Sequence, residues 1–269
     1  MVKKVQKAGS ISTQSQGSPS IPSSSKVGLS IVIPCYNEEE GIPHLVSQLN
    51  VALQKLEQQY AVELVFVDDG SKDKTHELLQ KYYGSDARAK IVQHEQNRNL
   101  GAALRTGFSH CCGDYVAALD SDCTYNPEVL LTMLGMMDDQ THMVTVSPYH
   151  PQGKVNNVPG YRIFLSKGVS LLYKTVLSCP LHTYTAMVRV YKKEVINQVQ
   201  FKADNFLGVT ELLVKSLLQG YKAKELPVEL SVRKFGVSKM KALPVKVIGS
   251  HLSLLSKIVK YKWFNIPFQ

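Results

Sequence analysis

Long apolar runs and paired-cysteine motifs are both missing from this sequence. No uninterrupted apolar stretch approaches the ~20 residues that a membrane-spanning helix needs, so no such helix is predicted. None of the five cysteines has the Cys-x-x-Cys spacing of a metal or redox site, and the neighbours Cys111 and Cys112 would pair only with strain. We therefore interpret the cysteines as small buried thiols of a protein in a reducing cytoplasm.

Acidic residues are absent from both ends of the chain. Residues 1–29 carry four lysines and residues 231–269 carry eight basic residues, whereas all 22 acids lie between them. The net charge of +9 therefore belongs to the ends, and it favours an anionic partner such as a phosphate, an acidic lipid surface or nucleic acid. No basic stretch is interleaved with aromatic residues that would stack on bases, so nucleic acid is not an expected partner.

Residues 1–28 lack the pattern of a folded segment. The stretch 9–26 is rich in serine, glutamine, glycine and proline and has no apolar core of the kind found in signal peptides, which predicts a disordered tail. The chain of 269 residues, 44% of them hydrophobic, is otherwise long enough to bury a sizeable core in one large or two small domains.

Strand and helix patterns alternate along much of the chain, which predicts an α/β fold with a mostly parallel central sheet and helices on both faces. Strands are predicted at 29–34, 62–67, 89–93, 114–119, 143–146, 183–190 and 223–232, of which the first and 114–119 are expected to be buried. Helices are predicted at 39–58, 73–83, 101–112, 161–177 and 209–218, with 147–159 as a loop.

Three polar clusters follow predicted strands: Tyr36-Asn37-Glu38, Asp68-Asp69-Gly70 and Asp120-Ser121-Asp122. In parallel sheets ligands bind beyond the carboxyl ends of the strands, so the clusters are expected to form one site. The two carboxylates of the last cluster, one residue apart on a turn, can reach a single divalent cation that takes its other ligands from substrate phosphates. The alternative is a solvated loop with helix-capping acids.

These clusters belong to a longer ordered set of motifs that resembles the family 2 glycosyltransferases, which have the GT-A nucleotide-sugar fold. The resemblance covers residues 29–240 and rests on five segments: Ile33–Glu39, Val67–Ser71, Asn99–Ala103, Gly113-Asp114 and Asp120–Asp122. Within that family the sequence is most similar to polyprenyl-phosphate sugar transferases of the dolichol-phosphate mannosyltransferase type. The segment Arg233–Lys239 carries this narrower likeness, because it matches their Arg-x-x-Gly-x-Ser-Lys loop.

The resemblance implies a role for each motif residue. The nucleotide-sugar would be bound by Pro34, Tyr36, Glu38, Val67, Asp69, Asp120 and Ser121. Asp120 and Asp122 would hold Mg²⁺ or Mn²⁺ against the diphosphate, with Asp122 essential for catalysis. The acceptor phosphate would be bound by Arg162, Arg189, Arg233 and Lys239, of which the last two also count as catalytic.

The implied reaction moves a sugar from a GDP- or UDP-sugar to a polyprenyl phosphate of the dolichyl or undecaprenyl type. A phosphate monoester is already anionic at neutral pH, so this acceptor needs orientation more than a general base. Direct displacement would invert the anomeric centre. The alternatives are a family 2 transferase with a glycan or other hydroxyl acceptor, and a catalytically inactive relative that binds nucleotide-sugar.

Three elements of the sequence depart from the pattern of those relatives. Pro148 stands where an arginine usually follows the fifth strand, and Thr124 stands where a glutamine often follows the metal-binding aspartates. The usual Gly-Phe-Arg element corresponds to Met187-Val188-Arg189, in which only the arginine remains. These departures concern the acceptor more than the nucleotide.

Residues 241–269 form a basic segment with helical spacing. Val245, Ile248, Leu252, Leu255 and Val259 fall on one face, and Trp263 and Phe264 follow. The pattern predicts either a helix lying on an acidic membrane or a helix packed on the domain or a second subunit. With a polyprenyl acceptor, the protein is expected at the cytoplasmic face of a membrane as a peripheral enzyme, with a membrane-protein subunit or a second copy as candidate partners.

Overall fold

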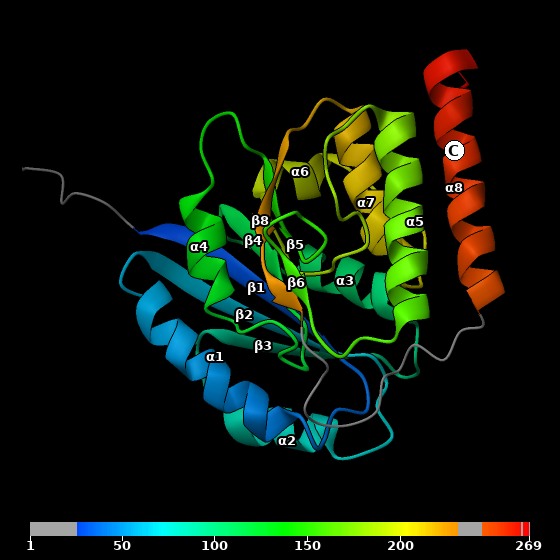
Figure 1. The fold of residues 1–269 in the computed structure, drawn as a ribbon. Coiled ribbons are helices and arrows are strands. Elements are labelled where there is room, and N and C mark those ends of the chain that lie inside the picture. The colour runs from blue at the N-terminus through cyan, green and yellow to red at the C-terminus, as the bar shows by residue number, and fades with distance from the viewer. Residues whose placement is uncertain (1–25, 231–243, 265, 269) are drawn as a thin grey trace, which may run out of the picture.

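The computed structural model describes residues 26–230, 244–264 and 266–268 (Figure 1). A seven-stranded sheet runs through it in the order β3-β2-β1-β4-β7-β5-β8. Its strands are β1 (Val27–Cys35), β2 (Tyr60–Asp68), β3 (Ala89–Gln93), β4 (Tyr115–Ala118), β5 (Met143–Ser147), β7 (Arg189–Lys192) and β8 (Ala223–Pro227). Only β7 runs antiparallel to its neighbours in this sheet, which confirms the predicted mostly parallel arrangement.

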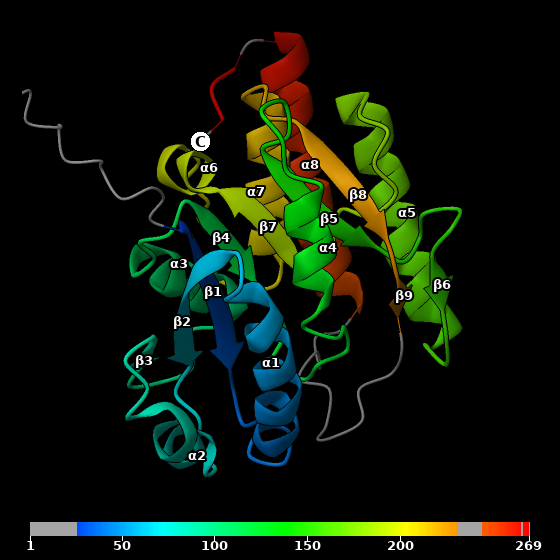
Figure 2. The same cartoon turned by 90° about the vertical axis from the view of Figure 1, so that its left-hand side faces the viewer.

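Helices cover both faces of the sheet, as the alternation in the sequence predicts (Figures 1 and 2). One face is covered by α1 (Ile42–Leu56), α2 (Thr75–Tyr83) and α4 (Val129–Gly135). The other is covered by α3 (Leu100–Ser109), α5 (Gly160–Leu177), α6 (Lys193–Gln198), α7 (Leu207–Leu218) and α8 (Pro244–Phe264). Alternate strand residues serve the two layers: Val32 packs into the second core and its neighbours Ile31 and Ile33 pack into the first.

The expected strand at 183–190 is wrong over most of its length, because β7 begins only at Arg189. Residues 182 and 183 are held in a loop by polar contacts: both backbone N–H groups donate to Glu225, each at 2.8 Å, and the Thr183 hydroxyl meets that of Ser147 at 2.8 Å. The predicted strand at 223–232 is interrupted after β8. Its second part, β9 (Glu229–Leu230), pairs with β6 (Lys154–Val155) inside the segment predicted as a loop.

Helix α8 packs on α5 and α7 through one face. Leu254, Leu255 and Ile258 are buried there, whereas Leu252, expected on the same face, is exposed. His251 is also buried, and its Nδ1 lies 3.1 Å from the Tyr173 hydroxyl. Burial lowers the pKa of this imidazole to about 4, so His251 packs as a neutral group. None of the described helices has the length and apolarity needed to cross a bilayer.

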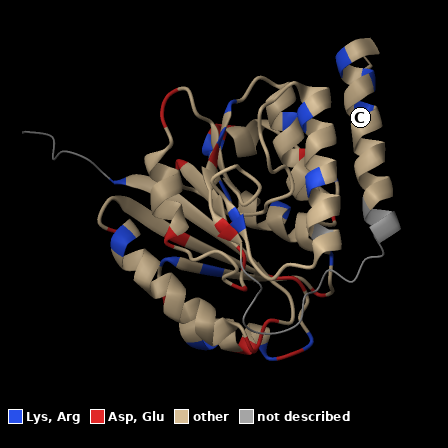
Figure 3. Cartoon of the chain, in the orientation of Figure 1, with Lys and Arg blue, Asp and Glu red and all other residues tan. Residues whose placement is uncertain are grey.

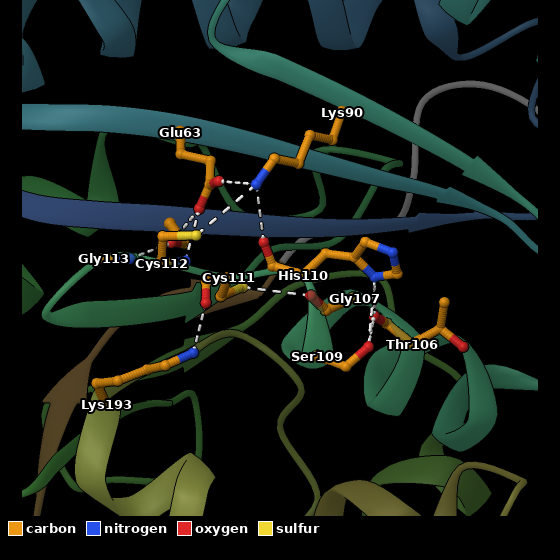
Figure 4. Close-up of polar contacts among 11 residues, drawn as sticks. Glu63, Lys90, Thr106, Gly107, Ser109, His110, Cys111, Cys112, Gly113 and Lys193 are labelled. Atoms are coloured by element: carbon orange, nitrogen blue, oxygen red, sulfur yellow. Dashed lines mark hydrogen bonds and ion pairs between the residues drawn. The ribbon is translucent and has the colours of Figure 1, made fainter.

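A polar cluster ties together the amino ends of β1, β2 and β3, at the opposite edge of the sheet from the predicted site (Figure 4). The Glu63 carboxylate accepts hydrogen bonds from the Ser30 hydroxyl at 2.6 Å and the Cys112 N–H at 2.9 Å, and it pairs with the Lys90 ammonium. Burial alone would raise the pKa of Glu63, but these donors together lower it.

We expect Glu63→Gln to reduce the free energy of unfolding by about 1–3 kcal/mol near neutral pH, because it removes the charge that accepts from the buried Ser30 hydroxyl, the Cys112 N–H and Lys90. The pKa of Glu63 is lower in the folded protein than its ordinary 4.5, so the stabilisation is present above that value. It is lost as the pH falls through the lowered pKa. Urea unfolding at several pH values measures the difference, which should shrink in acid. Glu77→Gln, at an exposed position of α2, is the control.

Candidate active site

The carboxyl ends of β1, β2 and β4 meet around the side chain of Cys35, the last residue of β1. Cys35 lies opposite Asp68 in the parallel register, and its carbonyl accepts the Asp69 N–H at 2.8 Å. Burial raises the pKa of the Cys35 thiol well above its ordinary value, with nearby Glu38 and Asp68 acting in the same direction and a hydrogen bond with Ser121 opposing them. One thiol is thus close to a residue of each polar cluster.

The loop after β1 is tied to the loop after β2. Asn37 adopts a left-handed conformation with φ of 51°, its N–H donates to the Ser71 hydroxyl at 2.9 Å, and its side-chain oxygen accepts the Lys72 N–H at 2.7 Å. The N–H of the buried Glu38 donates to the Thr75 hydroxyl at 2.7 Å. These contacts fix the two loops as one rigid edge.

The same edge contains the remaining residues predicted for the nucleotide from these two strands. Pro34 and Val67 are buried partners in the register of β1 with β2, and Tyr36 is half-buried immediately beyond them. Proline is tolerated there because Pro34 lies beyond Val32, where the pairing of β1 with β4 ends.

The two aspartates that end β2 differ in their bonding. Asp68 is fully buried and both its oxygens serve the protein: Oδ1 accepts the Ser71 N–H at 3.0 Å, and Oδ2 accepts the Gln93 amide at 3.0 Å. The contacts that Asp69 makes with other described residues all fall on Oδ1, which lies 2.7 Å from His94 Nδ1 and accepts the Arg98 N–H at 2.9 Å. Asp68 therefore has a structural task, whereas Asp69 retains capacity for a ligand.

Asp120 and Asp122 lie on the turn that follows β4, and both are near the side chains of Cys123 and Tyr125. Burial raises the pKa of the Cys123 thiol to about 12, and both carboxylates add to this shift. They also raise the pKa of Tyr125, again after burial as the main cause. The turn is shaped by Cys123, whose φ is 51°, and by the Thr124 N–H, which donates to Asp122 at 2.9 Å.

The donor set of this turn fits a hard divalent cation such as Mg²⁺ or Mn²⁺, since both carboxylates offer oxygen and both lie at the strand edge. Within the described part of the chain, no group of three or more His, Cys, Asp and Glu residues gathers to hold a metal. An ion at Asp120 and Asp122 would therefore complete its coordination with water and substrate oxygens, which is how Mg²⁺ commonly binds beside phosphates.

Side chains that sequence reasoning missed connect this turn to α5. The Tyr149 hydroxyl adds to the raised pKa of Tyr125, after burial and Asp120, and Tyr149 forms a hydrogen bond with Ser166 of α5. The Ser166 hydroxyl in turn lies 2.8 Å from that of Thr185. In the sequence, Tyr149 could have been noticed as an aromatic residue directly after Pro148, whereas an isolated hydroxyl residue on a helix gives no indication of a site.

Among the four predicted acceptor residues, only the side chain of Arg189 is described. Arg189 is fully buried, and its guanidinium donates to the Tyr191 hydroxyl and the carbonyls of Val209 and Ala186 at 2.9–3.1 Å. Arg189 therefore connects β7 to α7, and we leave it out of the proposed acceptor site. Arg162 lies in the first turn of α5. Arg233 and Lys239 lie outside the described residues.

Comparison with protein families matches residues 30–200 to the model described as glycosyl transferase family 2. The chain is 30% identical to the dolichol-phosphate mannosyltransferase of Pyrococcus furiosus over 240 residues, which covers 87% of this chain and 64% of that protein. It is 30% identical to the polyprenol monophosphomannose synthase of Mycolicibacterium smegmatis over 217 residues, covering 78% and 80% of the two chains.

A third relative is the undecaprenyl-phosphate 4-deoxy-4-formamido-L-arabinose transferase of Salmonella choleraesuis, 30% identical over 213 residues, with 78% of this chain and 62% of that protein covered. The chain thus spans slightly less than two thirds of the Pyrococcus and Salmonella proteins. Among solved structures, the glucosyl-3-phosphoglycerate synthase of Mycobacterium tuberculosis with Mn²⁺, UDP and glucosyl-3-phosphoglycerate matches with a TM-score of 0.61 at 20% identity, covering 90% of this chain and 81% of that one. This likeness shows the fold.

We expect an alkylating reagent to distinguish the buried Cys35 at this edge from the exposed Cys112. The thiolate is the reactive form, and burial both shields Cys35 and raises its pKa, whereas Cys112 is exposed. Iodoacetamide at mildly alkaline pH should modify Cys112 in the native protein and leave Cys35 intact, as read by peptide mass mapping. Both should react after denaturation. Native alkylation of Cys35 at the rate of Cys112 would contradict this account of the strand edge.

Proposed function

This chain belongs to glycosyl transferase family 2, and we propose that it transfers a sugar from a nucleotide-sugar to a polyprenyl phosphate. The observation that carries the proposal is the meeting of three polar strand ends around Cys35, with paired carboxylates on one of them. The names of the three relatives supply the acceptor class, because each contains a dolichol, polyprenol or undecaprenyl phosphate.

On the donor side, Asp120 and Asp122 would hold Mg²⁺ or Mn²⁺ against the diphosphate. The bound ion offsets diphosphate charge and so makes the nucleotide a better leaving group. Pro34, Tyr36, Glu38, Val67, Asp69 and Ser121 line the nucleotide pocket. The support for this arrangement is positional: these residues belong to one strand edge whose loops are cross-bonded and whose core is fully buried.

On the acceptor side, Arg162, Arg233 and Lys239 orient the lipid phosphate beside the anomeric carbon. Arginine offers paired donors to phosphate oxygens and lysine a point charge. The phosphate monoester attacks as an anion without a general base, and displacement on the face opposite the leaving nucleotide inverts the configuration. The hydrogen bond of Tyr149 with Ser166 supports this side, because it joins the loop after β5 to the helix that carries Arg162.

The protein acts as a peripheral enzyme at the cytoplasmic face of a membrane, held by α5 and α8. Neither helix contains an acidic residue, and Figure 3 shows only basic charge along both. Large apolar side chains are nevertheless exposed on them: Phe164 at 77% and Trp263 at 60%. Exposed apolar residues beside exposed Lys257 and Lys260 suit an acidic lipid interface, which the same helices would share with any membrane-protein subunit.

One observation favours a hydroxyl acceptor as the second candidate. His182 Nδ1 lies 2.8 Å from the largely buried Glu225, an arrangement that orients an imidazole, and the His150 ring is 5.1 Å away. An oriented imidazole could accept the proton of a hydroxyl, a step that a lipid phosphate does not require. An assay of the purified protein with Mg²⁺ or Mn²⁺ and GDP- or UDP-sugars distinguishes the two candidate functions by which acceptor receives the sugar, polyprenyl phosphate or a glycan. Binding without turnover would indicate an inactive relative.

We expect Asp122→Asn to lower turnover at least about a hundredfold in that assay, because it removes one of the two carboxylates that would hold the cation against the departing diphosphate. Product is measured as radiolabelled sugar extracted with the lipid. Asp139→Asn changes an exposed aspartate in the loop after α4 and should leave turnover unchanged. Full activity of the Asp122→Asn protein would remove the metal-clamp assignment.

The single tryptophan, Trp263, reports membrane docking directly. Its emission should shift to the blue when phosphatidylglycerol vesicles are added, and much less with phosphatidylcholine vesicles, because the lysines of α8 favour anionic lipid. Lys257→Glu with Lys260→Glu should weaken the shift. Lys74→Glu with Lys81→Glu makes the same change of charge around α2 and should not. An unshifted emission with anionic vesicles would contradict docking through α8.

A further inference from the structure

His150 and His182 form a pair of imidazoles outside the family motifs. Their ring centroids are 5.1 Å apart, and the rings meet edge to face with an angle of 76° between their planes. His150 follows β5 and His182 follows α5, so the two rings come from different loops. Both residues are half-buried, and 31% of the His182 side chain is exposed. The pair is therefore open to a ligand from solvent.

The hydrogen bonds of the two rings fix where each one carries its proton. An ionised carboxylate only accepts, so His182 Nδ1 must donate in its 2.8 Å contact with Glu225. The Gln152 N–H donates to His150 Nδ1 at 3.2 Å, so that nitrogen must accept. A neutral imidazole has one donor and one acceptor nitrogen. The Nε2 of His182 is therefore an acceptor, and the Nε2 of His150 is a donor.

Glu225 is itself held in place by the loop that it faces. Its Oε1 accepts the N–H groups of His182 and Thr183, each at 2.8 Å, and its side chain is only 7% exposed. The Thr183 hydroxyl also lies 2.8 Å from that of Ser147, the last residue of β5. These contacts restrict the His182 ring, so its acceptor nitrogen is presented in one direction.

A donor and an acceptor side by side match a hydroxyl group. An alcohol both donates and accepts, so it can donate to His182 Nε2 and accept from His150 Nε2–H. Two nitrogens that share one oxygen at ordinary hydrogen-bond lengths lie about 4.5–5 Å apart, which ring centroids 5.1 Å apart permit. Among the described residues, neither Nε2 has a hydrogen-bond partner. A phosphate dianion has no proton to donate and would match only His150.

The pair lies at the same edge of the sheet as the aspartates after β4. β5 runs parallel to β4 because both pair antiparallel with β7, so the loop with His150 leaves the sheet at the edge of Asp120 and Asp122. Two strand steps separate β4 from β5, a span of about 10 Å. This separation is comparable with the reach of a hexose ring joined to a diphosphate. A sugar whose diphosphate is held at Asp120 and Asp122 can therefore place a hydroxyl at the two imidazoles.

We propose that His150 and His182, the latter positioned by Glu225, bind one hydroxyl of the sugar in the nucleotide-sugar donor. This inference rests on the proposed function and deepens it. A polyprenyl phosphate carries no alcohol, so with that acceptor the hydroxyl comes from the donor, whose ribose would lie on the other side of the diphosphate, toward β1 and β2. Donor choice then depends on the configuration of one sugar carbon, because inverting that carbon moves its hydroxyl away from both rings.

The first test measures donor binding by calorimetry with the full-length protein and Mg²⁺. The probes are UDP-glucose, UDP-galactose, UDP-N-acetylglucosamine and GDP-mannose, each compared with its own free nucleotide. For the donor that binds most tightly, His182→Phe should weaken binding about tenfold, as expected for one lost hydrogen bond, and should leave binding of the free nucleotide unchanged. His110→Phe changes an exposed histidine at the end of α3 and should alter neither affinity.

Each other result of this titration counts against the proposal. Equal weakening of the donor and its nucleotide, or full donor affinity in a folded His182→Phe protein, overturns the hydroxyl subsite and leaves the proposed function standing. Unchanged donor affinity together with lost transfer to a glycan overturns it in favour of His182 as a base. Failure of every donor and nucleotide to bind the unaltered protein overturns the subsite and the proposed function together.

The second test removes the sugar hydroxyls one at a time. Deoxy analogues of the same donor, each without one hydroxyl, are titrated into the unaltered protein and into the His182→Phe protein. One analogue should bind the unaltered protein about tenfold more weakly than the parent donor, and this loss should vanish in the variant, because two changes to one contact are not additive. Losses of the same size in both proteins at every position would overturn the assignment.

The positioning role of Glu225 has a matched variant in Glu225→Gln. The N–H groups of His182 and Thr183 both point at Oε1, so the amide oxygen must occupy that place and the amide NH₂ must face His182 Nδ1. The ring then accepts at Nδ1 and carries its proton on Nε2, which turns the acceptor of the pair into a donor. Because fluorine does not donate, the preference for the hydroxyl over a fluorine at the same carbon should fall about tenfold. The same preference in a folded Glu225→Gln protein would overturn the role assigned to Glu225.

Discussion

Parallel pairing of β1 with β2 on one side and with β4 on the other is the constraint on which the site depends. The registers Cys35 with Asp68 and Val32 with Ala118 bring three strand ends to one edge. At that edge a small buried thiol lies near one residue of each cluster: Glu38, Asp68 and Ser121. A slip of one residue in either pairing would turn Asp69 or the aspartates after β4 toward the opposite face, because strand side chains alternate.

Burial decides which of the polar residues at this edge are available for ligands. Asp68 and Arg189 are charged groups at or near strand ends, yet both are fully enclosed and their hydrogen bonds go to the protein. Asp69 sits beside Asp68 in the sequence but has its bonds on one oxygen only. Whether such a group bonds only within the protein depends on residues that are distant in sequence but close in the fold, chiefly Gln93, His94 and Tyr191.

The sequence was informative wherever a local pattern has a local cause. Apolar runs located β1 to β5 and helical spacing located α1, α2, α3, α5 and α7, because burial on a sheet repeats along the chain. The start of β7 was missed because Glu225 and Ser147, far away in sequence, hold residues 182 and 183 in a loop. The contacts of Tyr149, Ser166 and His94 were missed for the same reason: each depends on a partner that only the folded chain brings near.

The single antiparallel strand has a consequence for how such a protein can change over time. β7 lies between β4 and β5, so the donor motifs of β1, β2 and β4 form one half of the sheet, and β5 and β8 form the other. Apart from Thr124, the departures from the family pattern fall after β5 or just before β7. Substitutions there leave the register of the donor half untouched. The fold thus behaves as two separable modules, in which a fixed nucleotide half can be combined with diverging acceptor halves.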